Sequence, residues 1–225
     1  MIPLRDDNPT VSFPLVTISL IVLNVVIFFY EISLGPQFEA FLNTYGAKPL
    51  YILNMASPPG LPSPHLTIFS SMFLHGGFFH VAGNMLYLWI FGNNIEDSMG
   101  HFKFIVFYLI SGIVAVYIFA FMNPGSTTPM VGASGAVSGV LGAYLVLFPR
   151  AKVLTLIPFG FYMQVVRIPA VFVLGLWIVV QILNGMVSGG RGGGIAWFAH
   201  IGGFLAGVLL VGLFKKRGDA GYSRE

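Results

Sequence analysis

Six apolar segments constrain the fold of this chain more than any other feature. They cover residues 14–34, 78–95, 102–122, 134–148, 168–187 and 195–214. Most of them approach the roughly 20 residues that a helix needs to cross a hydrocarbon layer about 30 Å thick. With 56% hydrophobic and only 8% charged residues, the chain is too apolar for a soluble domain of 225 residues. We therefore predict an all-α fold, a polytopic membrane protein with a bundle of six transmembrane helices.

The positions of Lys and Arg predict how the helices are oriented. With the N-terminus inside, nine of the 11 Lys and Arg residues are internal, whereas Lys48 and Arg191 are external. Cytoplasmic connections typically carry such an excess of positive charge. We therefore expect both termini in the cytoplasm. Residues 1–13 would be a loosely ordered lead, residues 14–214 the membrane domain and residues 215–225 a basic cytoplasmic tail.

The composition also excludes several classes of function. The chain contains no cysteine, which excludes disulfides, thiolate metal sites and thiol catalysis. Its formal net charge of +3 is small and scattered along the chain, so no nucleic-acid partner is expected. The partner that the composition does predict is the lipid bilayer.

Three connections between the apolar segments have distinct compositions. Residues 35–77 mix aromatic residues with a Pro-rich patch, and we favour a partly inserted interfacial element over a plain surface loop. Residues 149–167 are basic with aromatic residues and are expected to form a simple anchor at the cytoplasmic face. The Gly-rich residues 188–194 suit a lid and a slack linker about equally well.

Ser134 lies where the fourth apolar segment begins, after a polar and uncharged loop. The first N–H groups of a helix have no partner within it, and the positive end of the helix dipole favours developing negative charge. Gly132 and Ala133 leave little side chain in the way of an approaching backbone. The position therefore suits a serine nucleophile and its oxyanion. An ordinary N-cap serine within a small-residue packing face remains the alternative.

Three further polar side chains lie at a depth similar to that of Ser134. Measured from the inner end of its helix at 1.5 Å per residue, Ser134 is about 24 Å away and His200 about 22 Å. His80 and Asn84, four residues apart on one helix face, are about 24 Å and about 18 Å away. Polar groups at such depths are functional candidates because burying them in hydrocarbon is unfavourable. Depth alone does not show that the four side chains face one another.

Glycines favour close contact between the fourth and sixth apolar segments. They are Gly135, Gly139 and Gly142 on the fourth, with Gly203 and Gly207 as a G-x-x-x-G pair on the sixth. Small residues let two membrane helices approach closely. That approach would bring His200 within hydrogen-bond reach of Ser134 Oγ. We expect Gly132, Gly135, Gly203 and Gly207 to support the site.

Each candidate side chain also has a structural interpretation. His200 can bond a neighbouring carbonyl, and His80 and Asn84 can link two helices by hydrogen bonds. For His75, at the outer interface, a structural role is favoured. Gln181 is expected to make an interhelical hydrogen bond. A metal site made by the histidines is disfavoured, because no carboxylate is expected at their depth to complete it.

Taken together, these residues resemble the rhomboid family of intramembrane serine proteases over about residues 65–210. The resemblance rests on three motifs in order: His75-x4-His80-x3-Asn84, Gly132-Ala-Ser134-Gly135 and Ala199-His200-x2-Gly203-x3-Gly207. It implies a six-helix rhomboid-like bundle with a Ser134–His200 dyad that lacks an acidic third member. It also implies an oxyanion pocket made by His80, Asn84 and the Ser134 backbone N–H.

The function implied by the resemblance is that of an intramembrane serine endopeptidase. It would cleave transmembrane or juxtamembrane segments of membrane proteins through an acyl-enzyme, without a metal or other cofactor. A catalytically silent relative that binds membrane clients is the alternative. We expect the plasma (inner) membrane of a prokaryote, with the site open to the outer face. The sequence does not indicate the oligomeric state.

Two positions depart from the pattern of the family. Many members carry a Trp-Arg pair in the outer connection, whereas the comparable stretch here runs from His65 to Phe69. Many also carry an aromatic residue one turn after the serine, where it packs on the histidine. Ser138 occupies that place in this chain.

Overall fold

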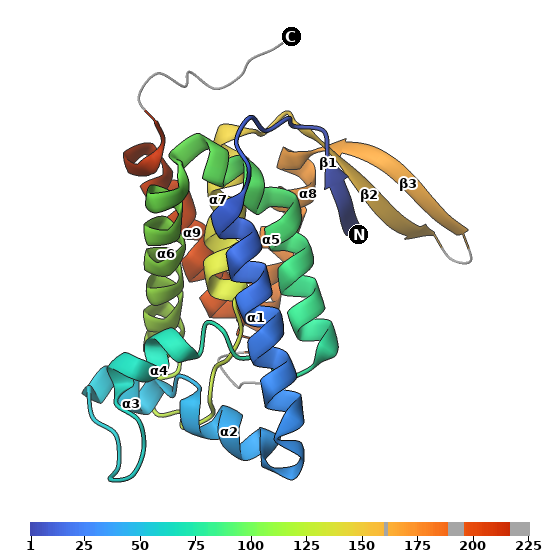
Figure 1. Cartoon of the computed structure of the whole chain (residues 1–225). Helices are drawn as coiled ribbons and strands as arrows, with labels where there is room; N and C mark the ends of the chain where they lie inside the picture. The colour runs from blue at the N-terminus through green and yellow to red at the C-terminus, as the bar shows by residue number, and fades with distance from the viewer. Residues whose placement is uncertain (160–161, 189–195, 217–225) are drawn as a thin grey trace.

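The computed structural model describes residues 1–159, 162–188 and 196–216, and these form a mainly helical bundle with a small sheet at one end (Figure 1). The helices are α1 (Leu15–Ser33), the short η1 (Gly35–Gln37), α2 (Phe38–Tyr45), α3 (Pro49–Asn54), α4 (Pro64–Ser70), α5 (Phe78–Met99), α6 (His101–Met122), α7 (Ser134–Leu147), α8 (Ala170–Ser188) and α9 (Trp197–Phe214). The strands are β1 (Ile2–Asp6), β2 (Lys152–Phe159) and β3 (Tyr162–Pro169).

Among the described residues, four helices are long and apolar enough to cross a membrane: α1, α6, α8 and α9. Their outward faces carry large exposed hydrophobic side chains, such as Phe29 on α1 and Leu209 on α9. The chain is therefore an integral membrane protein, as predicted. Of the other two predicted spans, α7 has only 14 residues and α5 carries polar residues near both ends.

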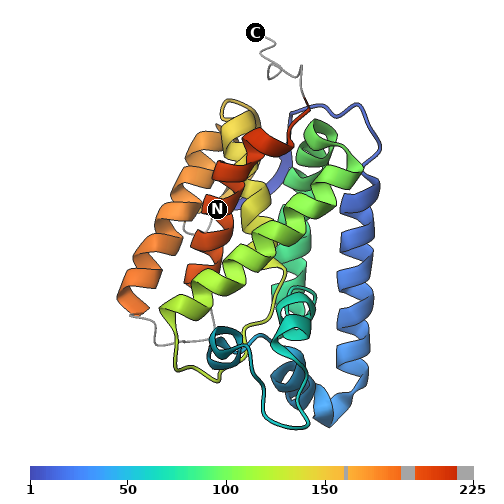
Figure 2. The same cartoon turned by 90° about the vertical axis from the view of Figure 1, so that its left-hand side faces the viewer.

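The core of the bundle forms around α7, which packs against α5, α6, α8 and α9. All ten residues from Gly135 to Tyr144 are buried. Helices α1 and α8 lie at opposite edges of the bundle (Figure 2). A short apolar helix enclosed on all sides in this way holds the residues at its N-terminus at a fixed place inside the protein.

Glycines allow α7 and α9 to pack with their backbones in contact, as predicted. A Cβ atom placed on Gly203 would lie 1.9 Å from Gly135 O, and one on Gly207 would lie 1.9 Å from Gly139 O. Both distances are far below van der Waals contact, so neither position has room for a side chain. The close approach sets the position of α9 relative to the first turn of α7.

The prediction of an all-α fold is wrong, because β1, β2 and β3 form an antiparallel sheet in the order β1-β2-β3. The segment 149–167, expected to be a simple anchor at the cytoplasmic face, forms strand β2 and most of β3, and anchoring by it stays a prediction. Residues 1–13 are not a loosely ordered lead, because they include β1. Burial in β2 alternates from Lys152 to Leu156, with Val153 and Thr155 completely buried. This period of two is typical of a strand with one covered face, and the β-branched residues of both strands favour it.

Two carboxylates at the end of α5 bind the end of the N-terminal lead and the first turn of α1. Glu96 accepts hydrogen bonds from the backbone N–H groups of Val16 and Thr17 at 2.8 and 2.7 Å, and from Thr17 Oγ1 at 2.7 Å. Asp97 accepts from the backbone N–H groups of Val11 and Ser12. Because the N-cap residue Pro14 makes no side-chain cap bond, Glu96 satisfies the first turn of α1 in its place.

The sheet is linked to α7 by a hydrogen bond of 2.6 Å from Tyr144 Oη to the Asp6 carboxylate. Burial raises the pKa of the Asp6 carboxyl to about 6, although the bond from Tyr144 opposes the change. Folded Asp6 thus holds its proton more tightly than unfolded Asp6, whose pKa is near 3.8. The contribution of Asp6 to stability is therefore largest below pH 4 and decreases as the pH rises to about 6.

We expect Asp6→Asn to remove this pH dependence while keeping an acceptor for Tyr144. The stability of the variant relative to the wild type should increase between about pH 4 and pH 6, by on the order of 2 kcal/mol, and then stay level. Thermal unfolding of both proteins in detergent across this pH range measures the difference. A difference that does not change with pH would contradict the assignment to Asp6.

The outer connection folds into the short helices α2, α3 and α4, at the opposite end of the bundle from the sheet (Figure 1). Helices α3 and α4 pack against α6. Partial insertion of this connection at the bilayer interface stays a prediction. Residues 189–194 of the expected lid or linker and residues 217–225 of the expected basic tail lie outside the described residues.

Candidate active site

Ser134 is the first residue of α7, and the loop before it is anchored on both sides. The backbones of Ala47 and Met130 exchange hydrogen bonds of 3.0 and 2.8 Å. The N–H of Gly132 donates to Ser71 O at 2.8 Å. These bonds connect the loop to the outer connection and fix where α7 begins.

Gly132 is required at its position for two reasons. Its φ of +127° is one that residues with a side chain rarely adopt. A Cβ atom there would also lie 2.6 Å from His80 Nε2 and 3.5 Å from Ser134 Oγ. The His80 ring therefore lies directly against the backbone that leads into Ser134, and the glycine makes this close approach possible.

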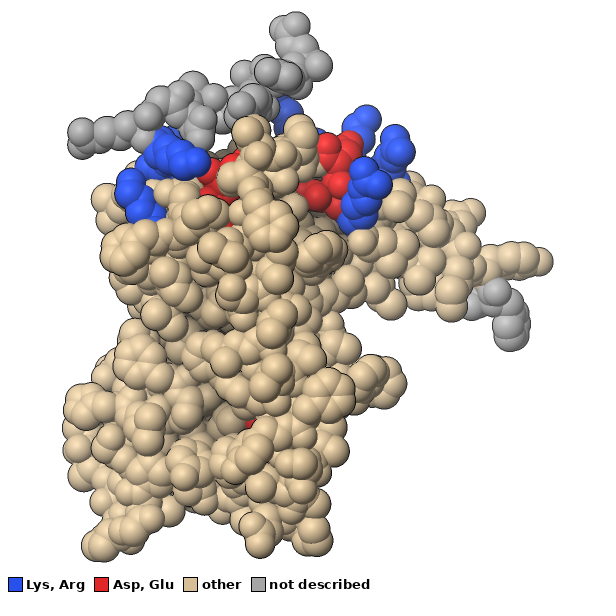
Figure 3. All heavy atoms as spheres, in the orientation of Figure 1, with Lys and Arg blue, Asp and Glu red and all other residues tan. Residues whose placement is uncertain are grey.

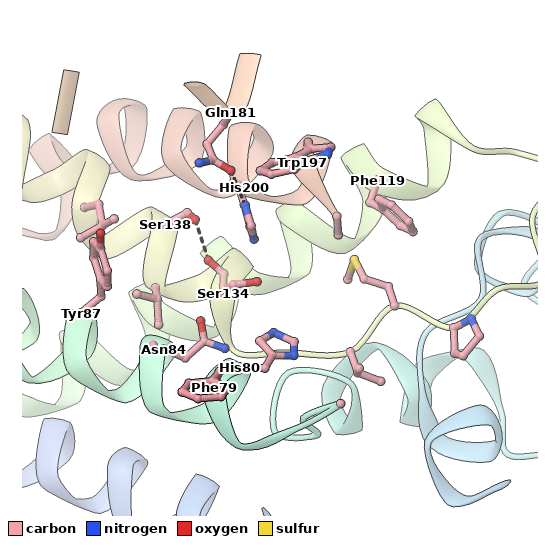
Figure 4. A pocket seen from close by; sticks show the side chains of 18 of the residues that line it. Phe79, His80, Asn84, Tyr87, Phe119, Ser134, Ser138, Gln181, Trp197 and His200 are labelled. Carbon is pink, nitrogen blue, oxygen red and sulfur yellow. Dashed lines mark hydrogen bonds between the residues drawn. The ribbon is translucent and has the colours of Figure 1, made fainter. Parts of the chain in front are cut away.

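His200, on α9, extends toward Ser134 from the side of the cavity opposite His80 (Figure 4). Its Nδ1 atom lies 2.7 Å from Oε1 of Gln181 on α8. Because an amide oxygen only accepts hydrogen bonds, this contact places the imidazole proton on Nδ1. The Nε2 atom is then free to accept a proton on the side of the ring that faces Ser134. The interhelical hydrogen bond predicted for Gln181 is confirmed, and its partner is His200.

Two tryptophan rings flank the imidazole of His200. The ring centroid of Trp177, on α8, lies 5.8 Å from that of His200 at an interplanar angle of 36°. The ring of Trp197, one turn before His200 on α9, lies 6.3 Å away and nearly perpendicular. These contacts restrict rotation of the imidazole and leave its Nε2 side directed toward the cavity (Figure 4).

His80 and Asn84 point from α5 toward the side of Ser134 away from His200 (Figure 4). The Nδ2 atom of Asn84 lies 3.0 Å from Nε2 of the buried His75, and the rings of His75 and His80 meet edge to face. An Asn amide nitrogen has two N–H groups. The bond to His75 uses one of them and holds the amide so that the second can serve the cavity.

Glu31 is a member of this network that sequence reasoning missed. Its side chain is completely buried in the apolar α1, and both carboxylate oxygens lie 3.3 Å from the backbone nitrogen of His75. The expectation that no carboxylate lies at the depth of the histidines is therefore wrong. A carboxylate in an apolar segment was the signal that could have identified it, because burial of such a group requires a partner.

A cavity of about 670 Å³ joins these side chains. Its lining includes Ser134, His200, His80, Asn84 and both flanking tryptophans, together with residues of the loop before α7. The structure thus brings together around one space the four polar residues that the sequence placed at similar depth. The volume falls within the range of small-ligand pockets.

The family follows from a comparison with known proteins. A family model described as the Rhomboid domain matches residues 63–217, which is more than half of the chain. The chain belongs to the rhomboid family. The resemblance inferred from the three motifs is confirmed.

Two curated relatives of this rhomboid are named as proteases, and a third is named as a rhomboid protein. Rhomboid protease AarA of Providencia stuartii is 28% identical over 210 residues, which cover 86% of this chain and 70% of that protein. Rhomboid protease GluP of Bacillus subtilis is 31% identical over 212 residues, covering 91% and 37%. The mitochondrial Rhomboid protein 1 of Saccharomyces cerevisiae is 34% identical over 152 residues, covering 64% and 40%. This rhomboid spans about two fifths of the length of the last two relatives.

Ser138 stands where many rhomboids carry an aromatic residue that packs on the histidine, but its side chain makes a different contact. Its hydroxyl donates to Ser134 O at 2.6 Å and so bonds its own helix. In this rhomboid His200 is oriented by Trp177 and Gln181 on α8, together with Trp197 on its own helix. The histidine is therefore held from the side of α8, and its orientation depends on how α8 packs against α9.

Proposed function

We propose that this rhomboid is an intramembrane serine endopeptidase that cleaves transmembrane or juxtamembrane segments of other membrane proteins. The observation that supports this most directly is the bond between Gln181 and His200 Nδ1, which leaves Nε2 as a base on the side of Ser134. The protease names of relatives such as AarA add to it. In this proposal residues 14–214 cross the bilayer six times, with both termini in the cytoplasm of a prokaryote.

The reaction begins when Ser134 Oγ attacks the scissile carbonyl and His200 Nε2 takes the hydroxyl proton. The C–N bond breaks when His200 passes that proton to the leaving amine, which produces an acyl-enzyme on Ser134. Water then enters the cavity and gives a proton to His200 as its oxygen attacks the ester. His200 then returns that proton to Ser134 Oγ as the ester C–O bond breaks, which releases the acid and restores the Ser134 hydroxyl. The reaction requires no metal or other cofactor.

In this proposal three donors stabilise the oxyanion that forms during each attack. The backbone N–H of Ser134 is at the start of α7, where the helix supplies no acceptor for it. The free N–H of Asn84 and the His80 ring approach from α5 (Figure 4). Such donors favour the transition state because they are in position before charge develops on the carbonyl oxygen.

The nature of the substrate follows from the location of the cavity inside a membrane protein. A helical substrate has its peptide bonds turned inward and hydrogen-bonded, so the segment must unwind before Ser134 can reach a carbonyl. Gly, Pro and other weak helix formers near the cleavage point lower the free energy needed for unwinding. Membrane proteins with such residues near one end of a transmembrane segment are the expected substrates and partners.

Cleavage of a panel of transmembrane substrates by the purified protein in liposomes tests this function. We expect cleavage near helix-weakening residues, with none in substrates whose segment is a uniform run of Leu and Ala. Binding of the same substrates without any cleavage would instead indicate the silent, client-binding alternative.

Gln181 is expected to act as a positioning residue for His200. In Gln181→Leu the Nδ1 proton loses its acceptor, so we expect kcat to decrease by about 10- to 100-fold with little change in KM. This is less than the roughly 10⁴-fold loss when the Asp of a Ser-His-Asp triad is replaced, because Gln181 carries no charge. Gln181→Glu retains an acceptor and should restore most of the activity.

Steady-state kinetics in one detergent measure these effects. Asn184→Leu, a change of similar polarity three residues further along α8, is the matched control and should keep normal kcat. An unchanged kcat in Gln181→Leu, or an equal loss in Gln181→Glu, would show that the hydrogen bond to His200 does not serve catalysis.

A further inference from the structure

The hairpin of β2 and β3 projects sideways from the bundle at the end where Lys and Arg gather (Figures 1 and 3). Its strands pair over their full length, from Lys152 with Pro169 to Phe159 with Tyr162. Strand β1 covers the other edge of β2 only as far as Leu156. Among the described residues, the outer edge of β3 pairs with no further strand. The hairpin thus extends beyond the protein that supports its base.

The projecting part of the hairpin is uncharged and its outer strand is exposed. No Lys, Arg, Asp or Glu occurs from residue 157 to residue 166. On β3 the exposed fractions are 79% for Tyr162, 74% for Met163 and 54% for Val165. An extended strand with such side chains open on both faces is unfavourable in water, so a partner must cover it.

The base of the hairpin has the opposite character. Lys152 on β2 and Arg167 on β3 are both exposed, and Leu154 pairs directly with Arg167. Figure 3 shows that the visible Lys and Arg lie at this end of the molecule, whereas the projecting part lies nearer the middle of the bundle. The base of the hairpin therefore lies level with the Lys and Arg side chains, and its far end lies level with the apolar surface of the helices.

This order of side chains matches the inner surface of a bilayer. Lys and Arg attract the phosphates of anionic lipids, while Tyr and aliphatic side chains are favoured just below the headgroups. Deep insertion is excluded, because the unpaired N–H and C=O groups on the outer edge of β3 would lose their hydrogen bonds to water. At the bilayer interface the basic residues can contact headgroups, the apolar side chains can contact lipid, and the edge of β3 can still bond water.

We propose that the β2–β3 hairpin is an interfacial membrane anchor. Tyr162, Met163 and Val165 insert among the lipids of the leaflet at the basic end, and Lys152 and Arg167 bind the headgroups of anionic lipids. Since β3 continues directly into α8 at Ala170, the anchor also fixes the height of α8 in the bilayer.

Because this chain contains no cysteine, a single introduced cysteine can be labelled for a direct test. The cysteine of the Met163→Cys variant is labelled with an environment-sensitive fluorophore, and the protein is reconstituted in liposomes of phosphatidylcholine with or without phosphatidylglycerol. Lys215→Cys, an exposed position after α9 at the same end, is the matched control. We expect severalfold weaker iodide quenching at position 163 than at 215, and strong quenching at 163 by lipids with a spin label near the headgroup.

The role of the two basic residues is tested in the same assay. Adding phosphatidylglycerol should further reduce iodide quenching of the probe at position 163. The double variant Lys152→Gln, Arg167→Gln should lose this further reduction and should behave like the wild type in phosphatidylcholine alone. Equal iodide quenching at both positions in both lipids would overturn the anchor. So would protection that requires a high ratio of protein to lipid and no contact with spin-labelled lipid, because it would indicate pairing of β3 with a second copy.

Discussion

Replacing Ser134 by Ala, or His200 by Ala, is expected to lower kcat for a transmembrane substrate by about 10³-fold or more. The first change removes the proposed nucleophile. The second removes the base, so that the Ser134 hydroxyl must lose its proton to water as it attacks. Because the two groups act in the same step, the double variant should be no less active than either single variant.

The reconstituted liposome assay measures this loss, and insertion of each variant is checked by its yield in the membrane. Ser19→Ala and His65→Ala are matched controls, since both residues are exposed and lie outside the cavity lining. They should keep the activity of the wild type. Full activity in Ser134→Ala or in His200→Ala would refute the dyad.

Gly207→Ala is expected to destabilise the bundle and to abolish most of its activity. The added Cβ atom would lie 1.9 Å from Gly139 O, a backbone atom that cannot turn aside, so α9 must move away from α7. Overpacking of this kind typically costs about 1–3 kcal/mol, and here it also moves the helix that carries His200. Thermal unfolding in detergent and cleavage in liposomes measure the two effects.

Gly212→Ala, on the same helix, is the matched control for this prediction. A Cβ atom there meets nothing within 4 Å, and Ala is the better helix former by about 1 kcal/mol. We therefore expect opposite signs, with a lower unfolding temperature for Gly207→Ala and an equal or higher one for Gly212→Ala. Similar unfolding temperatures in the two variants would show that the close contact of α7 and α9 is not required.

Much of the candidate site could be predicted because its parts obey local rules. A rise of 1.5 Å per residue gives the depth of a side chain from its distance to the end of a helix. This was sufficient to place Ser134, His200, His80 and Asn84 at one level. The glycine spacing of α9 indicated which helix it contacts, because few residue types allow two backbones to touch.

The sheet could not be predicted in the same way. Strand β1 pairs with a strand about 150 residues further along the chain, Ile2 with Leu156, and such pairing leaves no local signal. Residues 1–13 therefore read as a polar lead, although Asp97 binds the backbone of Val11 and Ser12. The pairing is decided by tertiary contacts at the end of the bundle.

The two contacts that complete the site were also beyond local rules. Gln181 was recognised as an interhelical donor or acceptor, but its partner His200 depends on the rotation of α8 about its axis. Glu31 contacts the backbone of His75 from 44 residues away. Helical periodicity gives the face on which a residue lies, but it does not give the neighbour toward which that face is turned.

The most direct test of the proposed dyad is the site at which a fluorophosphonate reacts with the protein in liposomes, mapped by mass spectrometry. The dyad predicts one adduct on Ser134, absent in Ser134→Ala and formed far more slowly in His200→Ala. An adduct on another residue, or a Ser134 adduct that forms equally fast without His200, would contradict it.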